Sequence, residues 1–209
     1  MITELEPELA NSLCRPLDPS LQYDIVFSKH FEKSGYYLSL RPLSINGDLN
    51  VIYQWLKDSF GNQLRKTQYS REQLLEVFRE MLALNYCQSF LGLINQIPAW
   101  QVDICNALND DIYSYISAKE NDYCVRVIIN PEIVEAGKTV ENVLDFCITY
   151  FFLFKAVKNI FFVLDVEQAG YGDFLLNSGF KSTATIDPLP YNSSLFQCSK
   201  PGYKRRPGS

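Results

Sequence analysis

Residues 36–58 read YYLSLRPLSINGDLNVIYQWLKD, and this segment shows two hydrophobic periodicities in succession. Apolar residues alternate up to Arg-Pro-Leu, which predicts a strand that ends in a polar turn at residues 44–47. Apolar residues then recur at three- and four-residue spacing from Leu49 to Leu56, which predicts an amphipathic helix. Asp48 stands where an N-cap would satisfy the first free amides of that helix. The segment therefore predicts a strand, a tight turn and a helix.

Length and composition are typical of a globular protein. The chain has 209 residues, of which 47% are hydrophobic, enough to bury a sizeable core. The net charge is −5 and no basic run interleaves with aromatics, so a nucleic-acid partner is not expected. The longest apolar stretch, residues 143–157, is shorter than the roughly 20 residues that a membrane span needs. We expect a buried helix there and no membrane partner.

The cysteine and histidine content argues against a metal centre. Six cysteines are scattered along the chain without a Cys-x-x-Cys pair, and the N-terminus carries no signal-like apolar segment. This spacing favours buried thiols in a reducing cytoplasm over a disulfide framework or a zinc site. His30 is the sole histidine, so a histidine-rich metal site is excluded and a Ser-His-Asp hydrolase is disfavoured. We therefore predict a cytoplasmic protein without a metal.

Further elements follow the first helix in a regular order. Residues 1–22 are expected to form an irregular arm and residues 23–28 a short strand of an N-terminal hairpin. Ser70 and Gln73 form a capping-box pattern that opens a second helix reaching Leu84. The remaining predicted elements are two strands within 88–105 joined at Asn95-Gln96, a strand at 123–129, a helix with Thr139 as its N-cap, a strand at 160–166, a helix that ends at Gly179, and strands at 181–186 and 193–198. Residues 201–209 are expected to be a flexible basic tail.

This order of elements resembles the GNAT superfamily of acyl-CoA-dependent N-acyltransferases. Residues 174–180, FLLNSGF, resemble the end of the superfamily's last helix, and residues 38–55 match the L-x-x-R-P-hydrophobic and D-L-x-x-hydrophobic-x-x-W patterns of its siderophore-biosynthesis branch. Residues 92–103, which run from a glycine through a proline to an acidic residue, are similar to the central hairpin of the siderophore-biosynthesis branch, the N6-hydroxylysine acetyltransferases and mycobactin-type acyltransferases. The resemblance covers residues 23–200. It implies one α/β domain with a mostly antiparallel central sheet and helices on both faces.

The resemblance also implies a reaction and its co-substrate. An acetyl or longer acyl group would pass from acetyl-CoA or another acyl-CoA to a small amine or hydroxylamine, within siderophore assembly, in a protein that is a monomer or a homodimer. A backbone amide on the cofactor strand would stabilise the oxyanion, and a helix N-terminus would bind the pyrophosphate. The positions that match the coenzyme-binding segments are Val127, Ile128, Ile129, Gly137, Lys138 and Thr139.

Two aspartates are candidates for the catalytic base. The siderophore branch carries a histidine on the cofactor strand and an aspartate on the next strand. Asp165 matches that aspartate, whereas Arg126 stands where the histidine would be. Because an arginine cannot accept the proton, the base is expected to be Asp165 or Asp103, the acidic residue of the central hairpin. Arg126 and Trp100 are candidate substrate-binding residues.

Each candidate also has a purely structural interpretation. Residues 137–139 would be an ordinary helix cap, and Glu135 beside them would repel a pyrophosphate. Arg126 would pair with Asp165 or with another carboxylate, and Asp103 would face solvent. These interpretations leave a second hypothesis, a non-catalytic member of the fold that binds a protein or a small ligand. A third hypothesis is acylation of a protein amine.

Overall fold

The computed structural model describes Leu13 and residues 23–58, 70–134, 138–165, 170–186 and 193–204. The strands are β1 (Phe27–Phe31), β2 (Tyr36–Pro42), β3 (Cys87–Ile94), β4 (Ile97–Asn106), β5 (Asp122–Ile129), β6 (Asn159–Asp165), β7 (Lys181–Ile186) and β8 (Ser193–Ser199). The helices are α1 (Ile45–Asp58), α2 (Arg71–Ala83), α3 (Pro131–Val134), α4 (Lys138–Leu153) and α5 (Gly170–Asn177), with 3-10 turns η3 (Ala107–Asn109), η4 (Asp111–Tyr115) and η6 (Lys200–Gly202).

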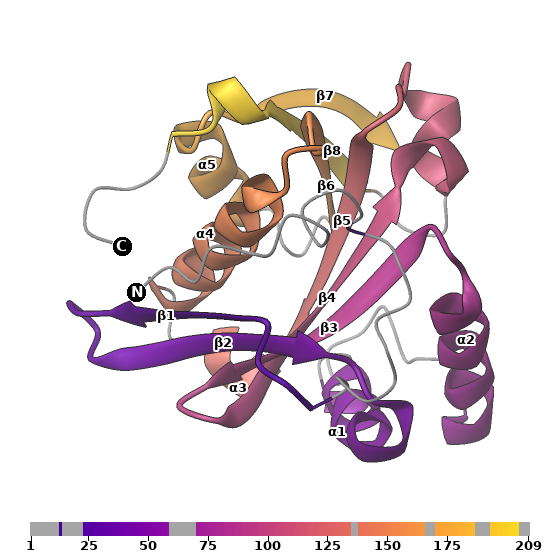
Figure 1. Ribbon diagram of the computed structural model, residues 1–209, viewed down its shortest axis with the longest axis vertical. Coiled ribbons are helices and arrows are strands. Elements are labelled where there is room, and N and C mark those ends of the chain that lie inside the picture. The colour runs from indigo at the N-terminus through magenta and orange to yellow at the C-terminus, as the bar shows by residue number, and fades with distance from the viewer. Residues whose placement is uncertain are drawn as a thin grey trace. The chain divides into compact units, whose positions relative to one another are not determined.

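The strands form one eight-stranded sheet in the order β1-β2-β3-β4-β5-β6-β8-β7 (Figure 1). The pairs β1–β2, β2–β3, β6–β8 and β7–β8 are antiparallel, and β5–β6 is parallel. This is the mixed, mostly antiparallel α/β sheet that the sequence predicted.

The chain divides into two compact units. Among the described residues, the first unit comprises 23–103 and 127–140, and the second comprises Leu13, 104–126 and 141–204. Strands β4 and β5 contribute residues to both units. The single domain predicted for residues 23–200 stays a prediction.

In the first unit, helix α1 begins one turn earlier than the sequence predicted. The carbonyl of Ser44 accepts hydrogen bonds from the amides of Gly47 at 3.2 Å and Asp48 at 2.8 Å, so the helix is already closed at Ile45. Asp48 is therefore inside the first turn, and its assignment as the N-cap was wrong. Its carboxylate accepts instead from the backbone amide of Ser44, at 2.8 Å, and from the guanidinium of Arg41.

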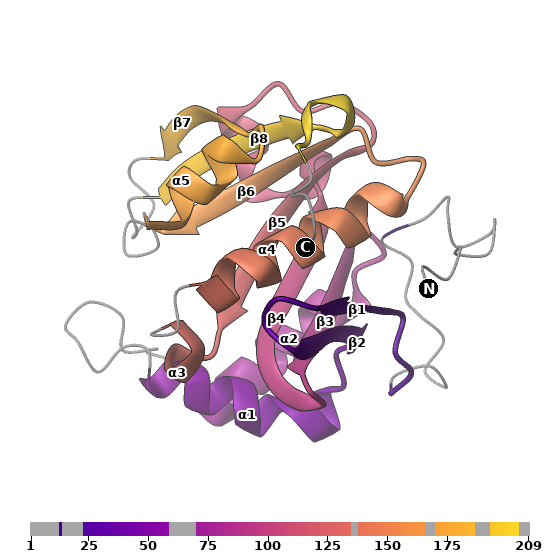
Figure 2. The ribbon, with the colours of Figure 1, turned by 90° about the vertical axis from the view of Figure 1, so that its left-hand side faces the viewer.

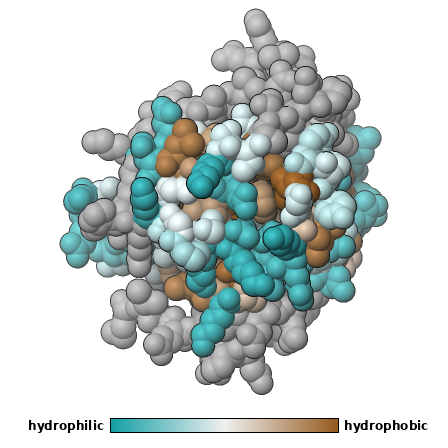
Figure 3. All heavy atoms as spheres, turned by 90° about the horizontal axis from the view of Figure 1, so that it is seen from above, coloured by the Kyte–Doolittle hydropathy of each residue, from teal (hydrophilic) through white to brown (hydrophobic). Residues whose placement is uncertain are grey.

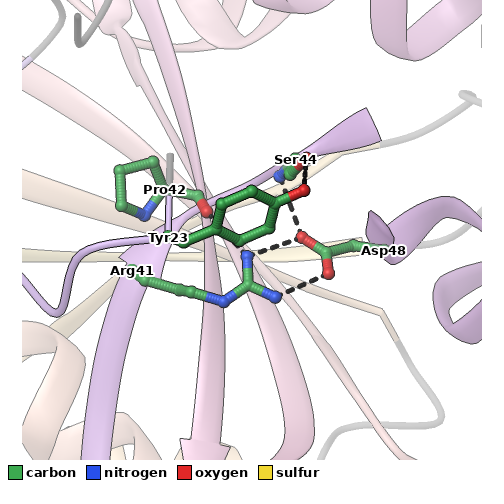
Figure 4. Close-up of polar contacts among 5 residues, drawn as sticks. All are labelled: Tyr23, Arg41, Pro42, Ser44 and Asp48. Atoms are coloured by element: carbon green, nitrogen blue, oxygen red, sulfur yellow. Dashed lines mark hydrogen bonds and ion pairs between the residues drawn. The ribbon is translucent and has the colours of Figure 1, made fainter. Parts of the chain in front are cut away.

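The Arg-Pro-Leu end of β2 is fastened to α1 by this carboxylate (Figure 4). Arg41 donates through Nη1 and Nη2 to the two oxygens of Asp48 at 2.8 and 2.6 Å, and both side chains are largely buried, at 12% and 5% exposure. Arg41 also lies 5.5 Å from the ring of Tyr23, whose hydroxyl hydrogen-bonds Ser44. Tyr23 is thus engaged with this cluster rather than in the strand predicted at 23–28, and β1 begins at Phe27, opposite Leu40.

Apolar side chains join α1 and α2 to strand β3 in the same unit. Ser70 caps α2 in a complete capping box with Gln73, as the sequence predicted. Leu74 and Phe78 then lie on the buried side of α2 at helical spacing. Together with the inner face of α1 and one face of β3 they form a core cluster of Leu43, Leu49, Ile52, Trp55, Leu74, Phe78, Leu91 and Leu93.

The β3–β4 hairpin turns at Asn95 and Gln96, as predicted from the sequence. Both residues have positive φ, 48° and 71°, a conformation of tight two-residue hairpin turns. Two hydrogen bonds to Tyr37 stabilise the positive φ of Asn95. Its Oδ1 accepts from the amide of Tyr37, and its own amide donates to the carbonyl of Tyr37, both at 2.9 Å. The turn is therefore anchored to the neighbouring strand β2.

In the second unit, α5 and residues 141–153 of α4 lie on one face of the strands β6, β8 and β7 (Figures 1 and 2). Helix α4 is buried along most of its length, as expected for the apolar stretch 143–157. It begins at Lys138, so Thr139 is its second residue and the assignment of Thr139 as N-cap was wrong. No helix in the described ranges is both long and apolar enough to cross a membrane.

The chain after α5 turns at Gly179, which has φ +94° as a helix-terminating glycine requires. A Cβ at this position would lie 2.1 Å from the carbonyl oxygen of Gly202, so only glycine allows the C-terminal segment to approach. The described part of the segment 201–209, expected to be a flexible tail, is docked: Lys204 donates to the carbonyl of Ser178 at 2.9 Å, and the Tyr203 hydroxyl donates to the buried Asp145 at 2.6 Å.

The cysteines follow the expectation in part. Cys124, Cys147 and Cys198 are buried thiols that form no disulfide, and burial raises the pKa of the Cys198 thiol to about 11. Cys87 and Cys105 are disulfide-bonded, which corrects the expectation of free thiols at those two positions.

Candidate active site

Asp103, one of the two predicted bases, lies on β4 next to a second polar side chain. Gln101 precedes it by two residues, so the two side chains project from the same face of the strand. Nε2 of Gln101 donates to both carboxylate oxygens of Asp103, at 2.9 Å each. Gln101 is fully buried and Asp103 is half-buried. This face of β4 therefore presents a carboxylate that is oriented from beneath by a buried amide.

Strand β5 carries the predicted coenzyme-binding residues Val127, Ile128 and Ile129 at its C-terminal end. Its parallel ladder with β6 joins Asp122 to Asn159 and continues to Val125 opposite Phe162, where it stops. Strand β6 goes on pairing with β8 as far as Asp165. Val127 and Ile128 are half-buried, whereas the preceding residues 122–125 are all buried. The final residues of β5 thus extend beyond the ladder with β6.

A short turn at Asn130 connects the end of β5 to α3 within the first unit. The amide of Asn130 donates to the carbonyl of Ala99 on β4 at 2.9 Å, and Oδ1 of Asn130 accepts from the amide of Glu132 at 3.1 Å. Asn130 therefore anchors α3 to the sheet. Lys138 and Thr139 are the first two residues of α4, and Gly137 lies outside the described residues.

Arg126 is held by the carboxylate of a residue that the sequence did not single out. Its guanidinium donates to the two oxygens of Asp110, at 2.5 Å from Nη1 and 2.8 Å from Nη2. The side chain of Asp110 is buried, with 6% of it exposed, and it is also the N-cap of η4, accepting from the amide of Ile112 at 3.1 Å. Arg126 thus forms an ion pair with Asp110, whereas the alternative pairing with Asp165 involves a side chain outside the described residues.

The protonation of this cluster follows from its geometry. Burial by itself would raise the pKa of Asp110, but the hydrogen bonds and charge of Arg126, with the amide of Ile112, outweigh burial and hold that pKa below its ordinary value. Burial raises the pKa of the neighbouring Cys124 thiol well above its usual range. The cluster is therefore an ionised Arg126–Asp110 pair beside a protonated thiol, and neither Arg126 nor Cys124 is a proton acceptor at neutral pH.

The other two predicted site residues occupy different environments. Trp100 is fully buried, with its indole packed against Gly92 of β3. Its predicted role in substrate binding stays a prediction, although the side chain is part of the core in this structure. Asp165 is the last residue of β6, in register with Ser193, and its side chain lies outside the described residues.

The predicted residues divide between the two units. Asp103, Trp100, the end of β5 and the start of α4 belong to the first unit, whereas Arg126 and Asp165 belong to the second. Gln101 and Asp110 were missed by the sequence analysis. The Asn-Asp-Asp run at residues 109–111 indicates a turn. Arg126, however, lies 16 residues after Asp110, and no local sequence pattern indicates that the two residues pair.

Two surface features of the described residues bear on the location of a site: groups of possible metal ligands and exposed apolar residues. In the part of the chain that the structure describes, no group of three or more His, Cys, Asp or Glu side chains is placed to hold a metal ion. On the face drawn in Figure 3, hydrophobic residues lie in separate patches between hydrophilic ones. Exposed apolar residues scattered in this way are normal for a folded protein and do not by themselves mark an interface.

Comparison with known proteins identifies the family. The profile of the Acetyltransferase (GNAT) domain matches residues 44–188. No curated protein matches the chain by sequence. Among solved structures, an uncharacterised protein from Bacillus halodurans is similar with a TM-score of 0.76 and 15% identity, covering 84% of this chain and 91% of that one.

Two further solved structures are enzymes with bound ligands. The spermidine N-acetyltransferase from Vibrio cholerae, in complex with CoA and spermine, has a TM-score of 0.61 and 18% identity over 79% of this chain and 97% of that one. An aminoglycoside acetyltransferase in complex with coenzyme A and kanamycin has a TM-score of 0.66 and 14% identity over 79% and 96%. At these identities the likeness shows the fold alone, whereas the profile match spans most of the chain. The chain therefore belongs to the acetyltransferase (GNAT) domain family.

Proposed function

We propose that this protein transfers an acetyl or longer acyl group from acyl-CoA to the nitrogen of a small amine or hydroxylamine. Family membership supports acyl transfer, and two structurally similar proteins bind coenzyme A together with a polyamine or an aminoglycoside. The observation that carries the proposal is the end of β5, which continues to Ile129 after its ladder with β6 has stopped at Val125.

A strand that outruns its ladder can accept an extended ligand. Backbone amides and carbonyls beyond Val125 would pair with the amide groups of the coenzyme's pantetheine arm, as an added strand pairs with a sheet edge. The N-terminus of the 16-residue helix α4, whose first three residues belong to the same unit as the end of β5, would bind the pyrophosphate through its first amides. Lys138, the first residue of α4, would add a positive charge. These elements fit the coenzyme's extended shape and its negative charge.

The proposed reaction needs a proton acceptor but no metal. The acceptor nitrogen attacks the thioester carbonyl carbon, the C–S bond breaks, and coenzyme A leaves as a thiolate that takes up a proton. The proton that the nitrogen loses passes to a carboxylate, for which Asp103 and Asp165 are the candidates. A backbone amide at the end of β5 would stabilise the oxyanion, a contribution of about 3 kcal/mol for one such donor.

The acceptor is proposed to be a hydroxylamine of siderophore assembly. The Leu-x-x-Arg-Pro pattern at residues 38–42 and the proline-containing central hairpin are similar to that branch. A hydroxylamine is neutral and nucleophilic at pH 7, so it needs only a weak base. This requirement fits a chain in which Arg126 takes the place of the branch's histidine and is engaged with Asp110.

The Arg126–Asp110 pair also favours an alternative function, that of a non-catalytic binding protein. An arginine paired with a buried aspartate cannot replace a histidine base, and the coenzyme loop at residues 135–139 keeps a single glycine. A non-catalytic member of the fold would show both features. It would bind a protein or a small ligand without acyl transfer.

Coenzyme binding separates the two candidates. Acetyl-CoA at about 100 times its dissociation constant should stabilise the fold by about 2.7 kcal/mol, seen as a saturable rise in melting temperature. Lys138→Gln should weaken the effect, and Lys57→Gln, at the exposed end of α1, should leave it unchanged. If millimolar acetyl-CoA and a longer acyl-CoA both leave the melting temperature unchanged, the transferase proposal fails.

A further inference from the structure

We propose that Gln101 is a positioning residue that holds the Asp103 carboxylate in the orientation needed to accept the proton of the acceptor nitrogen. This inference rests on the proposed acyl transfer. It starts from the two hydrogen bonds of 2.9 Å that Nε2 of Gln101 donates to Oδ1 and Oδ2 of Asp103. Both residues lie on β4, so a rigid strand sets the position of donor and acceptor together.

The burial of the two side chains differs in a way that suits this role. Gln101 has 1% of its surface exposed, so packing fixes its amide and leaves it no contact with a substrate. Asp103 is half-buried, so part of its carboxylate can reach a reacting group. The buried amide of Gln101 therefore fixes the orientation of the Asp103 carboxylate, and the exposed part of that carboxylate stays available to accept a proton.

The amide orientation follows from charge. If the Gln101 amide were turned over, Oε1 would lie against the Asp103 carboxylate, and two acceptors would face each other without a proton between them. Nε2 must therefore point to Asp103. This leaves Oε1 of Gln101 in the interior, with no hydrogen-bond partner among the described residues.

An interior carbonyl oxygen without a partner lowers stability, because it has lost its water and gained no donor. A methionine would fill nearly the same volume and bury no polar atom. Glutamine is therefore an unfavourable choice at position 101 for stability alone. The hydrogen bonds to Asp103 give the physical reason for a donor at this position, since a carboxylate held in one orientation needs less reorganisation during proton transfer.

The test compares Gln101→Met, Asp103→Asn and the double variant in the full chain. Gln101→Met should lower kcat by about tenfold and leave KM nearly unchanged, because misplacing the base affects the transition state and not substrate binding. In the Asp103→Asn background the same substitution should change kcat by less than about twofold, since Gln101 acts only through the carboxylate. Gln54→Met, on the exposed side of α1, is the matched control and should behave as wild type.

Activity of the wild type tests the proposed acyl transfer, and activity of the variants tests the positioning role of Gln101. If the wild-type chain transfers no acyl group, the proposed function fails and this role fails with it. If the wild type is active but the effects of Gln101→Met and Asp103→Asn on kcat multiply, the positioning role alone is overturned. Gln101→Met should fold with a melting temperature at or above that of wild type. If neither it nor Gln101→Leu folds, the amide is structural and the inference is wrong.

Discussion

Gly92 of β3 is the position where one added methyl group should be most damaging. A Cβ there would lie 1.8 Å from Cε2, 2.2 Å from Cδ2 and 2.3 Å from Cζ2 of Trp100. Carbon atoms in contact are normally about 3.5–4.0 Å apart, so the indole would have to move by about 2 Å. Trp100 has no exposed surface, so its ring cannot move aside without displacing the core around it.

The expected loss in the free energy of unfolding follows from the cost of overpacking a core. Extra methylenes in a well-packed core cost about 1–3 kcal/mol, and a displacement of this size in a buried ring places Gly92→Ala at the upper end, about 3 kcal/mol or more. For a chain of this length a loss of about 3 kcal/mol corresponds to a fall in melting temperature of about 6–12 °C. Without the clash the sign would reverse, because alanine restricts the unfolded chain more than glycine does.

Urea unfolding followed by circular dichroism measures this free energy. Gly47→Ala is the matched control: the nearest atom to its added Cβ would be 3.5 Å away, and the residue is exposed in the first turn of α1. Gly47→Ala should stabilise the protein by about 0.5–1 kcal/mol. A loss below about 1 kcal/mol for Gly92→Ala would refute the packing of Trp100 on Gly92. Trp100→Phe should offset part of the cost if the ring is the cause.

Three further substitutions test the buried polar contacts. Asp48→Ala should lower the free energy of unfolding by about 3 kcal/mol or more, because it leaves Arg41 as a buried charge without its bidentate partner; a urea midpoint equal to that of wild type would contradict this. Arg126→Met should destabilise the protein at pH 7 but not at low pH. Arg126 holds the pKa of Asp110 below its ordinary value, so the pair stabilises the fold fully above about pH 5 and is lost as the pH falls through the lower, folded pKa. The difference in free energy of unfolding should therefore shrink as the pH falls and Asp110 becomes protonated in the folded protein, and a difference that stays constant from neutral to strongly acidic pH would show that the charge pair is not the cause. Tyr203→Phe removes a hydrogen bond of 2.6 Å to a buried carboxylate of α4 and should cost about 1.5–3 kcal/mol, with faster hydrogen exchange at the C-terminal segment as the local readout.

The local elements of this fold were predictable because their causes are local. Ser70 with Gln73 placed the start of α2, Asn95-Gln96 placed the central hairpin turn, and Gly179 placed the end of α5. In each case the signal lies within four residues of the feature it controls. The family resemblance rested on the order of these elements, and the profile match to residues 44–188 supports it at the level of the superfamily.

The sequence-based assignments were wrong at residues whose side chains could form either a local or a tertiary interaction. Asp48 has the chemistry of an N-cap, but Arg41 and the amide of Ser44 both compete for its carboxylate, and the helix begins before it. Tyr23 lies in a strand-like run, yet its ring lies near Arg41 and its hydroxyl bonds Ser44. Propensity describes what a residue can do, and tertiary partners decide which use prevails.

The sequence by itself determined the class of the fold, the position of most strands and helices, and the residue types available for chemistry. Only the tertiary structure decided their partners: Arg126 with Asp110, Trp100 on Gly92, and Gln101 beneath Asp103. Periodicity and capping act over a few residues, whereas these contacts depend on which strands become neighbours and in which register. The free energy of such contacts comes from burial and charge after the chain has folded, so a linear pattern does not encode it in any single segment.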